Sequence, residues 1–186
     1  MKKILSLFVA AVMSMGTMAS AQDIALEGVA GMNIANVDVS GANSRIAFHL
    51  GARATYAFQS QSQGLYANAA ALFSLKGTKV GDVTYNPFYL EIPVHMGYKY
   101  PIVNNVAVFG EVGPYFALGL FGKANGVNIF GDNGFKRFDV GLGIHGGFEF
   151  SQKVRVSIGY DFGLLDVAKT GSAKNRNLMI SLGYKF

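Results

Sequence analysis

Hydrophobic and polar residues alternate along most of this chain with a period of two, the period of a β-strand whose side chains point to two faces in turn. In residues 44–58, for example, Ile46 and Phe48 lie on one face of the predicted strand, and Arg45 and His49 lie on the other. The same alternation recurs along the chain. We therefore predict eight antiparallel strands, at Asp23–Ile34, Ser44–Phe58, Leu65–Leu75, Phe88–Tyr100, Val106–Leu120, Phe138–Phe150, Val154–Leu164 and Leu178–Phe186.

The connections between these strands alternate in length. Three are short, and the four others are long and polar or rich in glycine. This rhythm is typical of a bacterial transmembrane β-barrel, which has short periplasmic turns and longer extracellular loops. An even number of strands then predicts both chain termini on the periplasmic side. The short turns lie around 59–63, 101–105 and 151–152, and the long loops are expected at 36–44, 76–85, 121–134 and 165–176.

The charged residues of the strands distinguish a membrane barrel from a soluble one. A soluble lipocalin-like barrel also alternates, but its polar face is outside and should carry many lysines. Here most lysines, such as Lys76, fall in predicted loops, and the polar faces carry arginines and carboxylates, which suit enclosed bidentate ion pairs. The opposite face carries essentially no charge, as lipid requires. We predict an interior charge network of Arg45, Arg53, Glu91, Glu111, Arg137, Asp139, Glu149, Arg155 and Asp161, balanced by Glu27, Lys99 and Lys185.

Aromatic residues gather at the predicted periplasmic ends of the strands. Rings at that depth form the girdle with which a barrel meets the membrane interface. The residues are Tyr56, Phe58, Tyr98, Tyr100, Phe148, Phe150, Tyr184 and Phe186.

The composition agrees with a membrane protein and adds an export signal. Of 186 residues 51% are hydrophobic and only 15% are charged, and without cysteine the chain has neither disulfides nor thiolate metal sites. A basic start at Lys2, the apolar stretch 4–15 and the small residues 19–21 predict a cleaved signal peptide at 1–21 and a barrel domain at 22–186. The apolar stretch is too short to span a bilayer, which needs about 20 residues.

The net charge points to no nucleic-acid partner. Its formal value for the full chain is +5, and two of these charges are signal-peptide lysines. The remaining small surplus is not arranged in any basic run, so we exclude nucleic-acid binding.

No motif in the sequence predicts catalysis, a metal or a cofactor. His49, His95 and His145 lie on the polar face of non-adjacent strands, so we expect their rings to start roughly 10 Å apart around the wall. A zinc site needs convergent ligands at about 2.0–2.1 Å, and interior hydrogen bonding is the better interpretation. A lipid-modifying enzyme would need a Ser–His pair at the lipid face, whereas these histidines point inward. We therefore predict no catalytic, cofactor-binding or metal-binding residues.

Several stretches resemble the outer-membrane protein β-barrel family of Gram-negative envelopes, which includes PorT-like proteins. They are residues 89–94 (YLEIPV), 113–115 (GPY), 137–143 (RFDVGLG) and 160–164 (YDFGL). The resemblance implies a barrel inserted among outer-membrane lipids. Phe186, preceded by Tyr184 and other apolar residues at alternate positions, looks like the signal read by the barrel assembly machinery.

These observations predict an all-β, eight-stranded, up-and-down transmembrane barrel with a filled interior, because eight strands leave room only for side chains. We expect a non-enzymatic role in envelope structure or in binding a protein or glycan through the extracellular loops. An accessory subunit of a protein secretion or envelope assembly machine, as PorT-like resemblance implies, is the alternative. A lipid-modifying enzyme is a third interpretation.

Overall fold

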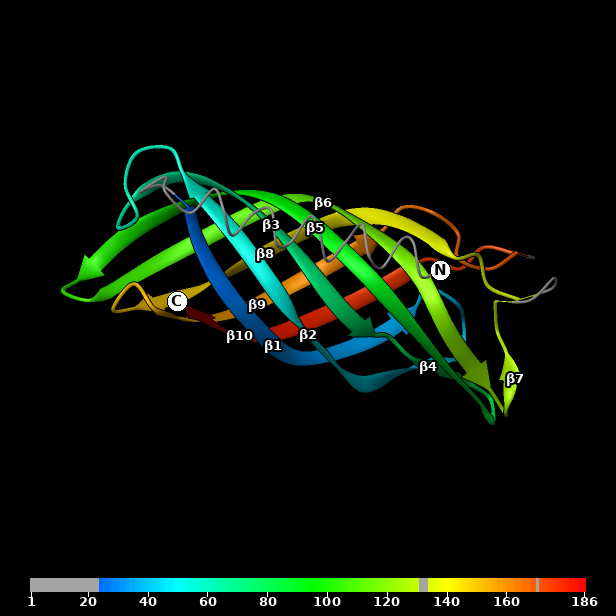
Figure 1. The fold of residues 1–186 in the computed structure, drawn as a ribbon. Helices are drawn as coiled ribbons and strands as arrows, with labels where there is room; N and C mark the ends of the chain where they lie inside the picture. The colour runs from blue at the N-terminus through cyan, green and yellow to red at the C-terminus, as the bar shows by residue number, and fades with distance from the viewer. Residues whose placement is uncertain (1–23, 131–133, 170) are drawn as a thin grey trace.

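The structure is a computed structural model that describes residues 24–130, 134–169 and 171–186 (Figure 1). The predicted signal peptide at 1–21 lies outside the described residues. Within them the regular structure consists of antiparallel strands, and no helix there is long and apolar enough to cross a membrane. The strands are β1 Ile24–Val37, β2 Ala42–Ala57, β3 Gly64–Leu75, β4 Thr78–Val80, β5 Val83–Val103, β6 Val106–Ala124, β7 Val127–Asn128, β8 Phe138–Phe150, β9 Val154–Gly163 and β10 Asn175–Lys185.

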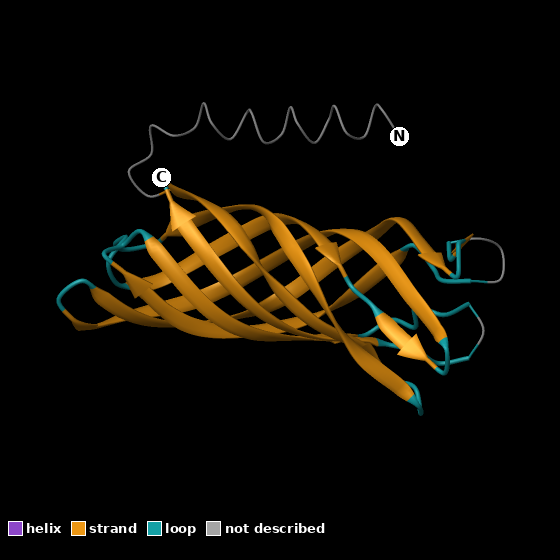
Figure 2. Ribbon diagram, turned by 90° about the horizontal axis from the view of Figure 1, so that it is seen from below, coloured by secondary structure: helices purple, strands orange, loops and turns teal. Residues whose placement is uncertain are grey.

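The eight long strands form a closed barrel. Each pairs with its neighbours along the chain, and β1 pairs with β10 from Glu27↔Lys185 to Val37↔Asn175. The strands wind obliquely around the barrel axis (Figure 2). Closure satisfies the backbone hydrogen bonds of the wall, which lipid could not do. The all-β, eight-stranded prediction is therefore confirmed, and the short strands β4 and β7 extend the sheet at its loop end.

One predicted loop is wrong. The connection between β1 and β2 covers only residues 38–41, not 36–44. The two strands keep pairing as far as Ala35↔Arg45, and Gly41 adopts a positive φ of 80° in the turn. A second predicted loop, 76–85, contains β4, which pairs with both β2 and β5. Strand pairing thus extends beyond the stretches in which the alternation is visible.

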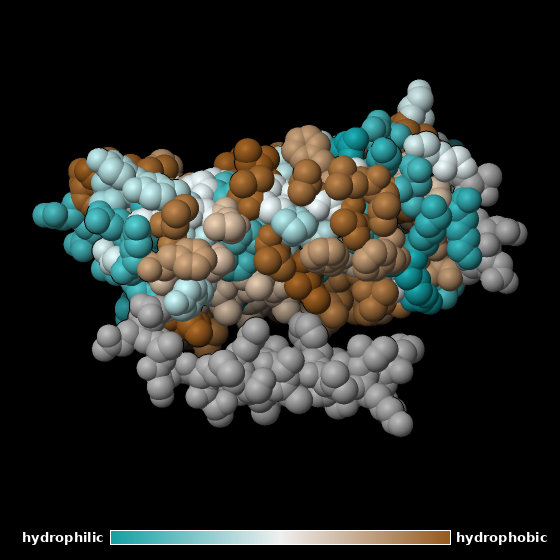
Figure 3. Space-filling model, turned by 90° about the horizontal axis from the view of Figure 1, so that it is seen from above, coloured by the Kyte–Doolittle hydropathy of each residue, from teal (hydrophilic) through white to brown (hydrophobic). Residues whose placement is uncertain are grey.

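The alternation in the sequence separates the outer wall of the barrel from its interior. On β8, for example, Phe138, Leu142 and Ile144 are exposed, whereas Asp139 and His145 are buried. The hydrophobic surface forms a band between two hydrophilic ends (Figure 3). The period-two pattern therefore predicted correctly which face each strand turns outward.

Two aromatic girdles bound this band. The residues predicted for the end with the short turns, here called the turn end, are all exposed, from 41% at Phe150 to 87% at Phe186. On β8, Phe138 and Phe148 are separated by about 33 Å along the strand, which is roughly 25 Å across the membrane at the usual tilt. The second girdle, at the loop end, was not predicted. It comprises Phe48, Phe73, Phe88, Phe121, Phe138, Tyr160 and Phe162.

Candidate functional site

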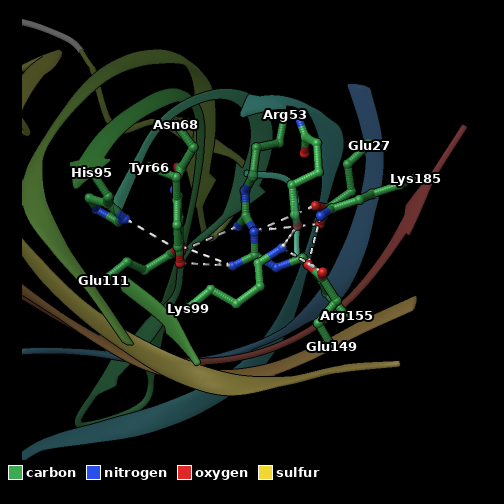
Figure 4. Close-up of polar contacts among 11 residues, drawn as sticks. Glu27, Arg53, Tyr66, Asn68, His95, Lys99, Glu111, Glu149, Arg155 and Lys185 are labelled. Atoms are coloured by element: carbon green, nitrogen blue, oxygen red, sulfur yellow. Dashed lines mark hydrogen bonds and ion pairs between the residues drawn. The ribbon is translucent and has the colours of Figure 1, made fainter. Parts of the chain in front are cut away.

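The barrel interior contains the chain's densest set of charged groups, and its centre is a quartet of two arginines and two glutamates. Glu27 on β1 lies directly opposite Arg53 on β2, and their side chains are 3.4 Å apart. Arg155 Nη2 lies 3.0 Å from Glu111 Oε2, and its Nη1 lies 3.8 Å from Glu27 Oε2. Figure 4 shows both guanidinium groups between the two carboxylates. Four strands, β1, β2, β6 and β9, are thereby joined across the interior.

Glu111 accepts further hydrogen bonds from β3, which is separated from β6 by β5 alone. Tyr66 and Asn68 on β3 both donate to its Oε2 at 2.9 Å. His95 Nδ1 lies 3.7 Å from its other oxygen. This carboxylate is almost fully buried, and such a charge is tolerated only when partners compensate for its lost hydration. Glu111 is therefore the most connected anion of the interior.

A second cluster lies toward the turn end. Glu149 stands between two lysines, with Lys99 Nζ 2.5 Å and Lys185 Nζ 2.6 Å from its two oxygens. Lys99 also donates to the carbonyl of Gln61 at 2.8 Å, which ties the cluster to the β2–β3 turn. In the strand register Glu149 faces Arg155, yet Arg155 binds the central glutamates instead. The ion pairs therefore run across the interior as well as along the wall.

A third cluster lies toward the loop end and includes a residue that the sequence analysis assigned to a loop. Lys76 follows β3, but its ammonium group is buried and lies 2.6 Å from Glu91 Oε2. It also lies 4.6 Å from the centre of the Tyr115 ring. A lysine in a polar connection carries no sequence signal that its long side chain turns inward, so this residue was missed.

The two aspartates of the predicted network lie in this loop-end half. Asp139 accepts hydrogen bonds from Tyr115 at 3.1 Å and from Asn175 at 2.7 Å. Asp161 lies 3.0 Å from Nε2 of His145. Both carboxylates are buried. Neutral donors and a histidine therefore replace the arginine partners that the sequence had suggested for these two residues.

Apolar side chains cover the interior at the loop end. Ile129 and Phe130, which follow β7, fold inward onto Tyr89 and Tyr115. Val167, from the β9–β10 connection, is fully buried beside Val37. Together with the charge clusters below, these residues leave the barrel without a wide channel through its described part.

Glycines on neighbouring strands make room for large interior side chains. A Cβ atom built on Gly159 would lie 2.3 Å from the His145 ring, and one on Gly97 would lie 2.4 Å from the Tyr66 ring. Both distances are far below contact. Glycine in a strand is otherwise unfavourable, and here it permits the dense packing of rings and charges.

Two arginines of the predicted network lie outside it. Arg137 is exposed, its Nη1 donates to the carbonyls of Gly119 at 2.8 Å and Leu120 at 2.9 Å, and it forms no ion pair with a described carboxylate, so the prediction that it belongs to the interior charge network is wrong. It precedes the first residue of β8, where the inward–outward alternation does not yet apply. Arg45 is only half-buried and donates to Asn86, without an ion pair to any described carboxylate. The remaining predicted members are buried in the interior.

Because Arg137 is exposed, we expect its position to tolerate a reversal of charge without loss of folding. The Arg137→Glu variant should refold and keep its heat-modifiable shift in gel electrophoresis, because the new carboxylate would face solvent and not the buried anions. Arg155→Glu, which makes the same change inside the barrel, is the matched control and should lose the shift. Loss of the shift in both variants would contradict the exposed placement.

The histidines lie closer together than the wall spacing suggested. The ring centres of His95 and His145 are 4.9 Å apart, so the expected separation of roughly 10 Å is wrong for this pair. Side chains from β5 and β8 converge inside the narrow barrel even though β6 separates the two strands. Among the described residues no group of three or more histidines and carboxylates is arranged to hold a metal ion.

His49 belongs to a separate hydrogen-bonded set. Its Nδ1 lies 2.8 Å from Asn33 Oδ1 and its Nε2 lies 2.9 Å from Ser181 Oγ. The order Ser–His–Asn is that of a nucleophilic triad. All three side chains are buried, with at most 7% exposure, and they lie inside the wall away from lipid. A lipid substrate would have to cross the packed interior to reach Ser181.

Comparison with known proteins agrees with this architecture. A profile described as outer membrane protein beta-barrel domain matches residues 7–186. The chain belongs to this family. Its members are built as barrels of the outer membrane, which agrees with the apolar outer wall and the two girdles. No curated protein matches the sequence.

Solved structures of small outer-membrane barrels share the fold at low sequence identity. The outer membrane enzyme PagL has a TM-score of 0.58 at 13% identity, covering 85% of this chain and 98% of its own. Neisserial surface protein A has a TM-score of 0.53 at 15% identity, covering 88% and 97%. The attachment invasion locus protein Ail of Yersinia pestis has a TM-score of 0.47 at 16% identity, covering 87% and 99%. Because an enzyme and a surface protein share this fold, the fold alone assigns no activity.

Proposed function

We propose that this chain is a non-enzymatic outer-membrane barrel with a structural or surface-binding role, whose interior stabilises the wall and conducts no solute. The observation that carries the proposal is the filled interior, where three charge clusters link side chains from different strands and apolar residues cover the loop end. A pore would need a continuous polar path, and a lipid-facing enzyme would need its nucleophile on the outer wall.

The proposed orientation places the loop end outside the cell. The two longest connections between the long strands, 125–137 and 164–174, are at this end, whereas both ends of the described chain lie near the turns. Barrels of this class have short periplasmic turns and longer extracellular loops. A signal peptide at 1–21 would export the chain, and the alternate apolar residues ending at Phe186 would be read by the barrel assembly machinery.

The loop end is the surface from which a protein or glycan could be bound, because loops carry most of the recognition in barrel proteins. The two other roles considered from the sequence were an accessory subunit of a secretion machine and a lipid-modifying enzyme. Neither is favoured by a particular arrangement of residues in the described part of the chain.

Single-channel recording tests the proposal. Purified protein refolded into planar bilayers should give no stable conductance steps, because the Arg53–Glu27 and Arg155–Glu111 pairs occupy the centre of the barrel. A porin in the same bilayers is the positive control. Steady open currents that scale with protein concentration would overturn the assignment of a filled barrel.

A further inference from the structure

Cations are concentrated at one end of the molecule. Among the described residues that are exposed or half-buried, eight cations and three carboxylates lie at the loop end, whereas Lys153 is the charged residue at the turn end. The eight cations are Arg45, Lys79, Lys123, Lys136, Arg137, Lys169, Lys174 and Arg176, and the carboxylates are Asp38, Asp82 and Asp166. This asymmetry directs an anionic ligand to the loop end.

Two of the three carboxylates already have partners within the protein. Asp38 accepts from Arg176 at 3.0 Å. Asp166 accepts from Ser172 at 2.7 Å and from the amide of Ala173 at 3.2 Å, and the bond from Ser172 holds the pKa of Asp166 below its usual value. Asp166 is therefore ionised, and its carboxylate holds together the β9–β10 connection in which it lies. Asp38 is occupied by Arg176, whereas Asp166 also acts at longer range on Lys174 and Lys136, whose positive charges contribute to the lowering of its pKa.

Three of the cations flank exposed phenylalanines on two neighbouring strands: Lys123 lies on β6, and Lys136 and Arg137 are the two residues before β8. We call this group the β6–β8 rim, and it consists of Phe121, Lys123, Lys136, Arg137 and Phe138. Arg137 lies beside Gly119 and Leu120 of β6, because it donates to Leu120 and its own carbonyl accepts from the amide of Gly119 at 2.5 Å. None of the three cations forms an ion pair with a described carboxylate.

The depth of the rim matches the lipid headgroup layer. Phe121 and Phe138 are 61% and 53% exposed and belong to the loop-end girdle. Lys123 and Lys136 are each two residues beyond these rings, about 5 Å farther from the membrane centre on a tilted strand. The headgroup layer extends roughly 5–7 Å beyond the hydrocarbon on each side. The cations therefore lie at the level of headgroup phosphates, and the rings lie at the level of the first acyl carbons.

Arg137 is held in position before any ligand binds. Its guanidinium group stacks 5.0 Å from the centre of the Phe130 ring. Both of its hydrogen bonds to carbonyls use Nη1, so other donors of the planar fork are available to a phosphate. A fixed guanidinium loses less conformational entropy on binding than a mobile lysine does.

From these observations we propose that the β6–β8 rim binds the phosphate groups of an anionic lipid of the surrounding leaflet, with the acyl chains against Phe121 and Phe138. The rim faces a leaflet in which such lipids are continuously present. Its two phenylalanines, Phe121 and Phe138, would contact the acyl chains of a lipid, which a free anion does not have. In the proposed orientation this leaflet is the outer one. The proposed orientation of the barrel, with its loop end outside the cell, decides only which leaflet supplies the lipid.

Native mass spectrometry of the refolded protein in detergent micelles tests the site with diphosphorylated lipid A as the probe. Micelles have no sidedness, so the result is independent of the orientation and of conductance. Lys123→Gln and Lys136→Gln should each weaken lipid binding about fivefold, and the double variant about 25-fold, as expected for cations near an anionic lipid surface. Lys153→Gln, the same change at the turn end, is the matched control and should bind like the native protein.

Two further probes identify the source of the phosphate. Lipid A without its phosphates should bind the native protein and the double variant equally. Inositol hexakisphosphate, a soluble polyphosphate, should compete only weakly because it lacks acyl chains. The proposal is overturned if the double variant binds lipid A like the native protein, if Lys153→Gln weakens binding as much, or if the soluble polyphosphate displaces lipid A at equal concentration.

Discussion

Replacing Glu111 with glutamine should lower the free energy of unfolding by about 3–5 kcal/mol, the usual cost of removing one partner from a buried ion pair. The amide keeps the shape of the side chain but removes the charge that compensates Arg155 at 3.0 Å and contributes to Arg53 at 4.0 Å. Both guanidinium groups would then share Glu27 alone at the centre of the barrel. Because the chain has no tryptophan, the folded fraction in a urea titration is best followed by the heat-modifiable gel shift.

An exposed ion pair provides the matched control. Asp38→Asn makes the same carboxylate-to-amide change beside Arg176, at a carboxylate whose side chain is 63% exposed, and should cost at most about 1 kcal/mol. In addition, Glu111→Gln combined with Arg155→Gln should lose less stability than the two single changes added together. Equal unfolding midpoints for Glu111→Gln and Asp38→Asn would contradict a stabilising role for the central quartet.

The second large effect is expected on the outer wall. Ile158→Arg places a cation near the middle of β9, where the native side chain is 56% exposed between the two girdles. In hydrocarbon this change should cost about 2–4 kcal/mol. Refolding into vesicles followed by urea titration measures the loss.

Leu164→Arg is the control for depth. Leu164 is also exposed, at 52%, but it lies just past the end of β9 and beyond the ring of Phe162. Near the interface an arginine should cost only about 0–1 kcal/mol. The two positions have similar exposure and differ mainly in depth, so equal losses would contradict the placement of the membrane between the girdles.

An unpaired charge lowers the stability of the barrel both in the buried interior and on the lipid-facing wall. Inside, charges are tolerated because partners from different strands meet, as Arg155 on β9 meets Glu111 on β6. On the outer wall there is no partner, and strand residues there are apolar between the girdles. Charge is tolerated again at the loop end, where Lys136 and Arg137 lie beyond the girdle ring of Phe138.

Much of the fold could be predicted from the sequence. Period-two alternation determines which residues face outward, and so the eight long strands, the outer wall and the turn-end girdle could be read from single segments. The boundaries were less accurate, since β1 continues to Val37 and the first loop is only four residues long, at 38–41. Strand ends depend on pairing with a neighbour, which the hydrophobic pattern of one segment does not contain.

The partners inside the barrel were decided by the tertiary structure. Alternation placed Glu149 and Arg155 on the same interior face, and the register sets them opposite each other, yet Glu149 binds two lysines and Arg155 binds Glu111. The sequence likewise did not indicate that Lys76 turns inward or that Arg137 stays outside. The physical reason is range: the direction of a strand side chain is a local property of the backbone, whereas its ionic partner depends on which groups closure brings together across the interior.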